Sequence, residues 1–411
     1  MRNWSKYAGI FAAAFIVVSG AVCADTGETK AAEYLSEYYN VEPFSIDEDT
    51  DADAVNAVLT ALGGKAIEGE FSNEAVIAEG IRLAGMEELA LSYENEADPD
   101  KAKEVLEREG VTAEHEEYAP YIACALDLGL IESGAEGKTD PEEFLYRCME
   151  IGGKGRHYVG RIQDENILSE MQTVMNEFVL FNNEQLTELG NLLVLGGTTT
   201  GYNLQYNKYR ANFLADYTIM YGHDSFQHAV QLIGLLKSEG MDGYIQVKPK
   251  ASVYEYMPEW GEPSEPTPTY AVREAAGGRY LCFAVEYDME IEFDTKEEKE
   301  AFHQLIEDYA KKYDDRVDED GNITAKLLAG SFWQPLYSSL TSMESEEYGE
   351  VADNVVYDKT GEYSLHSYSL PEKAGEIAEK VKELAPDLEA GPVTIYANPA
   401  FIRYLTGEDH Q

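Results

Sequence analysis

The most regular pattern of apolar and polar positions lies in the C-terminal third of the chain. From Val285 to Phe293 every second residue is apolar, and the residues between them are Glu286, Asp288, Glu290 and Glu292. A period of two is typical of a β-strand with one buried face, so we expect the acidic row to face solvent. Thr295 and Glu298 then form a capping box for a helix.

The residues that follow extend this strand and helix into a longer order of elements. Strands are expected at 351–357 and 363–369, followed by a helix at 371–384 and a last strand at 393–397. The order strand, helix, strand, strand, helix, strand is that of a ferredoxin-like sandwich. We therefore predict that residues 280–411 form an α+β domain with a four-stranded antiparallel sheet and both helices on one face.

In the N-terminal third, residues 31–153 read as short helices separated by acidic loops. The clearest pair lies between Tyr118 and Gly153. Its first helix carries one apolar stripe, a glycine-rich loop follows, and Asp140 can cap the second helix with Glu143 completing a capping box. This third of the chain is therefore predicted to be all-α.

This order of helix, glycine-rich loop and capped helix resembles the S-layer homology module, a small helical unit that occurs in tandem and docks on cell-wall polysaccharide. Tyr118 stands where family members usually have Trp, and Thr139, Asp140 and Glu142 stand in the motif that opens the second helix. The arginine of that motif is absent, and Arg147 is the candidate to replace it. The resemblance implies degenerate repeats that bind wall polysaccharide through these five residues.

The middle region, 156–279, is expected to be a mixed domain. A helix from Ser225 to Glu239 followed by a strand superficially looks like the core of transglutaminase-like and papain-like folds, in which a nucleophilic Cys opens the helix. Ser225 occupies that place, and the spacing of His223 and His228 does not put both on one helical face. We expect a polar helix cap here, and an exported enzyme or pseudoenzyme is the alternative.

The N-terminus has the pattern of a signal peptide. Arg2 and Lys6 precede a short apolar run, and small residues lead to a cleavage site after Ala24. Residues 1–24 are therefore expected to be removed, which leaves an exported protein at the cell wall or cell surface. No later segment is long and apolar enough to span a membrane. Lipidation of Cys23 is the competing interpretation, and it would make the protein a lipoprotein that binds a small ligand in its middle domain.

Composition narrows the classes of partner. With 78 acidic and 31 basic residues the formal net charge is −47, which repels nucleic acid and anionic lipid. Cys124, Cys148 and Cys282 remain after cleavage. A bridge between the first two is conceivable, but the odd number and the apolar neighbours favour buried thiols. The acidic residues of 47–53 lack the turn glycine and the terminal glutamate of a calcium loop, so neither a metal nor a cofactor is expected.

The sequence thus predicts a secreted, cell-envelope-associated binding or structural protein without catalytic activity. Its partner would be cell-wall polysaccharide, and the sequence does not indicate its oligomeric state.

Overall fold

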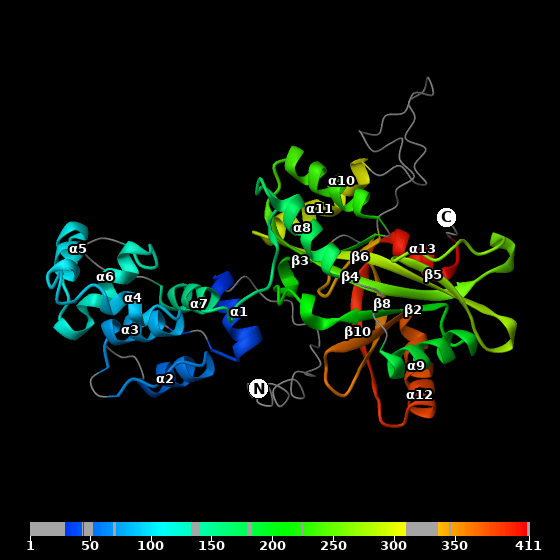
Figure 1. Ribbon diagram of the computed structural model, residues 1–411, viewed down its shortest axis with the longest axis horizontal. Coiled ribbons are helices and arrows are strands. Elements are labelled where there is room, and N and C mark those ends of the chain that lie inside the picture. Colours follow the sequence, from blue (N-terminus) through cyan, green and yellow to red (C-terminus); the bar gives the residue numbers. More distant parts are fainter. Residues whose placement is uncertain are drawn as a thin grey trace, which may run out of the picture. The chain divides into compact units, whose positions relative to one another are not determined.

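The computed structural model describes residues 29–42, 44, 52–68, 71–132, 140–178, 183–223, 225–309, 336–344 and 347–408. The chain divides into two compact units, one from Val17 to Arg156 and one that holds His157 to Gln411 (Figure 1). The expected signal peptide, Cys23 and Thr139 lie outside the described residues.

The first unit is helical in its described residues. Its α-helices are α1 (Lys30–Tyr39), α2 (Ala52–Ala61), α3 (Asn73–Leu83), α4 (Glu87–Leu91), α5 (Lys101–Glu109), α6 (Ala119–Asp127) and α7 (Pro141–Ile151). Asp140 caps α7 as expected, because its Oδ1 accepts the backbone N–H groups of Glu142 at 2.9 Å and Glu143 at 3.1 Å. Helices α3 and α7 approach closely at Gly80, where an added Cβ would lie 2.3 Å from Cε1 of Phe144.

The second unit is built on a closed antiparallel β-barrel. Eight strands form the ring β4-β2-β9-β8-β10-β7-β3-β6, which closes because β6 also pairs with β4. The strands, including β1 and β5 at the edges, are β1 (Gly160–Arg161), β2 (Gly201–Tyr206), β3 (Thr218–His223), β4 (Gly243–Tyr256), β5 (Tyr270–Glu274), β6 (Tyr280–Phe293), β7 (Leu336–Ser339), β8 (Gly349–Tyr357), β9 (Tyr363–Ser369) and β10 (Ala390–Ala397).

Helices cover two parts of the outer barrel wall and one part of its interior. Around β3, β4 and β6, apolar outward side chains pack with α8 (Ile167–Glu177), α10 (Phe226–Ser238) and α11 (Lys296–Tyr309). Around β2, β9 and the other halves of β4 and β6, they pack with α9 (Glu184–Leu195) and α12 (Ala374–Leu384). Figure 1 shows these two groups of helices on different sides of the barrel.

The last helix, α13 (Pro399–Thr406), packs against inward-facing residues of the barrel. Its Phe401, Ile402 and Leu405 lie against Val351 and Ile395. These two residues are register partners on β8 and β10, so α13 covers one end of the interior.

The predicted ferredoxin-like domain is wrong. Strand β6 pairs with β3, β4 and β5, whereas β8 pairs with β9 and β10 elsewhere in the ring. Accordingly, α11 and α12 do not lie side by side on one sheet: Phe302 belongs to the core of α8 and α10, and Ile377 to that of α9. Residues 156–279 and 280–411 together form the barrel, with helices interspersed between the strands. The physical reason is the full-length pairing of two 14-residue strands, from Gly243↔Phe293 to Tyr256↔Tyr280.

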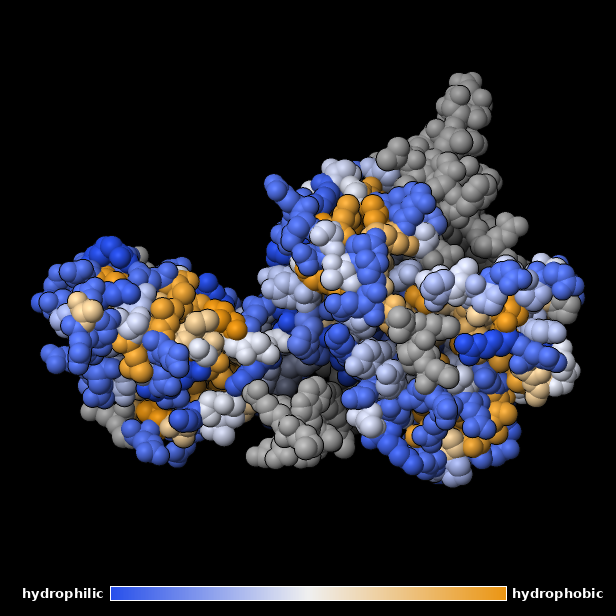
Figure 2. All heavy atoms as spheres, in the orientation of Figure 1, coloured by the Kyte–Doolittle hydropathy of each residue, from blue (hydrophilic) through white to orange (hydrophobic). Residues whose placement is uncertain are grey.

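Within the described ranges, none of the helices combines the length and the apolar character needed to cross a bilayer, as the sequence predicted. Figure 2 shows a largely hydrophilic face with separate hydrophobic patches on it.

Candidate functional site

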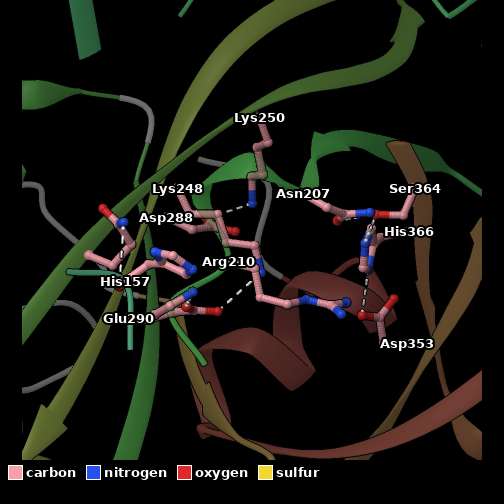
Figure 3. Close-up of polar contacts among 12 residues, drawn as sticks. His157, Asn207, Arg210, Lys248, Lys250, Asp288, Glu290, Asp353, Ser364 and His366 are labelled. Atoms are coloured by element: carbon pink, nitrogen blue, oxygen red, sulfur yellow. Dashed lines mark hydrogen bonds and ion pairs between the residues drawn. The ribbon is translucent and has the colours of Figure 1, made fainter. Parts of the chain in front are cut away.

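One wall of the barrel interior is lined with hydrogen-bonding side chains. Asn203 is the register partner of Ser252 and of His366, and Gln205 is that of Lys250 and of Ser364, so these residues share one face of the sheet. Their sequence neighbours Leu204, Ala251, Val253 and Leu365 belong to the outer core. We call the inward set the interior cluster: Asn203, Gln205, Lys248, Lys250, Ser252, Glu286, Asp288, Glu290, Asp353, Ser364 and His366. Figure 3 labels seven of them: Lys248, Lys250, Asp288, Glu290, Asp353, Ser364 and His366.

Ion pairs between β4 and β6 form the first part of the interior cluster. Lys250 Nζ lies 2.7 Å from Asp288 Oδ1 and 3.7 Å from Glu286 Oε2, and Lys248 Nζ lies 3.1 Å from Glu290 Oε1. Burial acts to lower the pKa of Lys250, but the carboxylates of Asp288 and Glu286 outweigh it, so the pKa lies above its ordinary value. Lys250 is therefore a permanent buried cation whose charge is balanced by its neighbours.

A relay of three side chains forms the second part. His366 Nδ1 lies 2.8 Å from Asp353 Oδ2, and its Nε2 lies 2.9 Å from Ser364 Oγ. Ser364 Oγ also lies 3.3 Å from Asn207 Oδ1, and Asn207 Nδ2 donates to the carbonyl of Gly361 at 2.6 Å. Both ring nitrogens of His366 are thus engaged, which fixes the imidazole against the β8–β9 wall.

The order Ser, His, Asp is also that of a nucleophile with its base and orienting acid. Ser364, however, has 0% of its surface exposed. A nucleophile needs room for the reacting carbon about 3 Å away and donors for the developing oxyanion. The arrangement therefore positions His366 and Asp353 in the interior, and in the described conformation it does not present a nucleophile.

Three oxygen atoms in the interior cluster are buried without a hydrogen-bond partner among the described residues. Asp288 Oδ1 still has an ion pair, because Lys250 Nζ lies 2.7 Å from it. The other two, Gln205 Oε1 and Asp353 Oδ1, have neither a hydrogen bond nor an ion pair with a described residue. Gln205 is 3% exposed and Asp353 is 9% exposed. Leaving a buried acceptor unpaired costs about 1–3 kcal/mol, and more for a charged group, so each such atom requires an explanation. A ligand that donates hydrogen bonds would supply one.

Arg210 lies at the end of the interior that α13 does not occupy. It follows a 3-10 turn at Asn207–Tyr209 after β2, and its Nη2 donates to the Tyr357 hydroxyl at 2.8 Å. Figure 3 shows the side chain running from the side of Lys248 and Glu290 toward Asp353. Arg210 is half-buried, so part of this residue is accessible to solvent.

The residues predicted from the module resemblance lie in the other unit and have structural partners there. Tyr118 ends a 3-10 turn, with its ring centroid 6.0 Å from that of His115. Asp140 is the cap of α7, and Glu142 is buried and accepts the backbone N–H of Phe44 at 2.7 Å. Arg147 is half-buried on α7. The first turn of α7 therefore brings Asp140 and Glu142 together, but their carboxylates bind backbone.

Ser225, the alternative catalytic residue considered from the sequence, lies away from the interior cluster. Ser225 precedes α10, which packs on the outer wall of the barrel, whereas Asp353 and His366 face inward. The thiols of Cys124, Cys148 and Cys282 are free and buried, so Cys124 and Cys148 are not bridged. Burial raises the pKa of the Cys148 thiol to about 12, which leaves it protonated and unreactive.

Sequence reasoning placed the acidic row of β6 on the wrong side. Glu286, Asp288 and Glu290 face the barrel interior, and Glu292 is fully buried and accepts the N–H of Leu214 at 2.7 Å. A signal was present, because Lys248 and Lys250 alternate with apolar residues on β4 as the acids do on β6. Two amphipathic strands with opposite charges indicate cross-strand ion pairs.

No family model, curated protein or solved structure matches this chain. Within the described ranges, no group of three or more His, Cys, Asp or Glu residues is placed to hold a metal ion.

Proposed function

We propose that this chain is an exported, cell-envelope-associated binding protein without catalytic activity, and that the interior cluster is its ligand site. The observation that carries the ligand site is the pair of buried acceptors, Gln205 Oε1 and Asp353 Oδ1, on the inner wall of the barrel. The leader pattern of residues 1–24 supports export. The module resemblance supports wall polysaccharide as the partner of the helical unit, with Tyr118, Thr139, Asp140, Glu142 and Arg147 as its contact residues.

The interior cluster favours a neutral ligand rich in hydroxyl groups. Gln205 and Asp353 need donors, and Arg210 offers donors to a ligand oxygen. The interior cluster contains four carboxylates and two lysines, so it carries more negative than positive charge. It would therefore repel an anionic ligand. The carboxylates are those of Glu286, Asp288, Glu290 and Asp353, and the lysines are Lys248 and Lys250. A hydroxyl group both donates and accepts, which makes a mono- or oligosaccharide the best fit to this set.

Thermal unfolding of the mature chain with a panel of soluble mono- and disaccharides tests this proposal. A ligand that binds only the folded state raises the unfolding temperature, and the rise grows with the logarithm of the ligand concentration once that concentration exceeds Kd. We expect a rise with at least one sugar, and a smaller rise for Asp353→Asn at the same concentration. Asp387→Asn is the matched control, because that carboxylate is exposed and paired with Lys359 on the surface. No rise with any sugar would contradict the proposal.

Hydrolysis is the second candidate function, because Ser364, His366 and Asp353 have the distances of a catalytic relay. A movement that exposed Ser364 would be required first. Incubation with a fluorophosphonate probe and with short acyl esters tests it. Turnover or labelling that disappears in Ser364→Ala would establish the enzyme and overturn the non-catalytic proposal.

A further inference from the structure

A groove of about 400 Å³ lies on the outside of the barrel, separate from the interior cluster. We call it the α9 groove, because one flank of α9 forms one side and the residues of and after β5 form the other. Its apolar floor consists of Leu192, Leu195, Leu281 and Phe283. The volume lies within the range of roughly 300–1,000 Å³ that is usual for ligand sites.

The rim of the α9 groove is acidic. Glu184 and Glu188 lie one turn apart on α9, and Glu274 ends β5 on the opposite side. None of these three carboxylates has an ion pair with any described residue. The one cation in the lining, Arg273, lies over the Phe283 ring at 4.9 Å. Three carboxylates against one guanidinium leave two negative charges in excess, so the groove attracts cations and repels anions.

Two further features of the lining indicate an occupant. Leu192 is 43% exposed although it continues the floor. Thr187 also lines the groove, and its Oγ1 is buried without a hydrogen-bond partner in the described part of the chain. An exposed apolar surface with a polar rim is the usual form of an interaction site, and the unpaired hydroxyl oxygen can accept a hydrogen bond from a ligand.

Strand β5 borders the α9 groove and ends the sheet order, so among the described strands it pairs only with β6. On its second edge Tyr270 already exchanges backbone hydrogen bonds with Thr267. The rest of this edge offers backbone N–H and C=O groups to an extended peptide. We propose that the α9 groove binds a basic amphipathic peptide segment, with an apolar side chain on the floor and lysine or arginine side chains at Glu184, Glu188 and Glu274. The acidic rim is the main support for this proposal, because its carboxylates attract a basic peptide and repel an acidic one.

Fluorescence anisotropy with the mature chain tests the proposal. The probes are two labelled peptides of equal length in which leucine alternates with lysine in one and with glutamate in the other. We expect binding of the lysine peptide only. Leu192→Asn, an exposed change that spares the core, should weaken it about tenfold by removing apolar contact. Glu184→Gln with Glu188→Gln should weaken it about fivefold, since exposed ion pairs are individually weak.

A matched control separates the α9 groove from general attraction to an acidic chain. Glu372→Gln with Glu379→Gln removes the same charge from exposed positions around α12. It should leave the affinity unchanged within twofold. Equal weakening by both double variants, or equal binding of both peptides, would overturn the proposal. Neither outcome bears on whether a sugar binds inside the barrel, so this test is independent of the proposed function.

Discussion

At the scale of single residues, the interior of the barrel combines ion-paired side chains with a few unpaired acceptors. Lys250 and Asp288 neutralise each other at 2.7 Å, whereas Gln205 Oε1 has no partner among the described residues. Unpaired buried acceptors destabilise the free protein and are retained where a ligand uses them.

The variant Gln205→Leu tests whether Gln205 contributes to ligand binding or to the stability of the fold. Replacing a buried amide whose oxygen is unpaired by an apolar group of similar size should leave stability unchanged or raise it by about 1 kcal/mol. The same change should weaken sugar binding about fivefold through the loss of one hydrogen bond. Urea unfolding and calorimetric titration measure the two effects. A large loss of stability would mean that Gln205 holds the barrel together.

Lys299 provides a pH signature in the outer core. Burial lowers the pKa of Lys299 to about 8 from its usual 10.5, although Asp216 acts in the opposite direction. Its Nζ donates to the carbonyl of Ala215 at 2.9 Å and to Thr341 Oγ1 at 2.8 Å. Between these two pKa values the unfolded chain binds more protons than the folded one, so this group adds stability as the pH rises and loses it as the pH falls.

The difference between the wild type and Lys299→Met therefore depends on pH. The wild type should gain about 2 kcal/mol relative to the variant between pH 8 and pH 10. Urea unfolding at several pH values measures this difference, and subtraction removes the titration of tyrosines that both proteins share. A stability difference that stays constant over this pH range would show that the pKa of Lys299 is not lowered in the folded state.

At the scale of elements, local patterns were predictive and pairing was not. The strands at 351–357 and 363–369 appear as β8 and β9, and the capped helix after Thr295 appears as α11. The alternation of apolar and polar residues in these strands, and the capping residues of the helix, determine structure only over a few neighbouring positions. Which strand lies beside which depends on partners far away in sequence, as with β2 between β4 and β9. The interior cluster was missed for that reason, because its residues become inward only when the ring closes.

The contact between α3 and α7 depends on Gly80. Gly80→Ala would bring a methyl group within 2.3 Å of the buried Phe144 ring, so the helices must separate. We expect a loss of about 1–3 kcal/mol, typical of overpacking. Gly234→Ala in α10 is the control, since no atom lies within 4 Å of its added Cβ. That change should stabilise the barrel unit slightly. Chemical denaturation followed by circular dichroism compares the two variants.

At the scale of the whole molecule, the chain consists of a helical unit and a barrel unit, each with its own buried residues. We expect residues 157–411 to fold without the helical unit, because the barrel closes entirely within them. The fragment should show a near-ultraviolet circular dichroism signal, which indicates packed aromatic side chains. It should also bind the sugar with the same affinity as the mature chain. Loss of cooperative unfolding in the fragment would mean that the helical unit contributes to the barrel.

The central claim is that a neutral sugar binds inside the barrel between Gln205 and Asp353. Calorimetric titration of the mature chain with the best sugar of the panel, repeated for Asp353→Asn and for Asp387→Asn, tests it most directly. Because a hydrogen bond to a charged group contributes more than a neutral one, the account predicts about tenfold weaker binding for Asp353→Asn and no change for Asp387→Asn. Equal affinity of both variants and the wild type would contradict it.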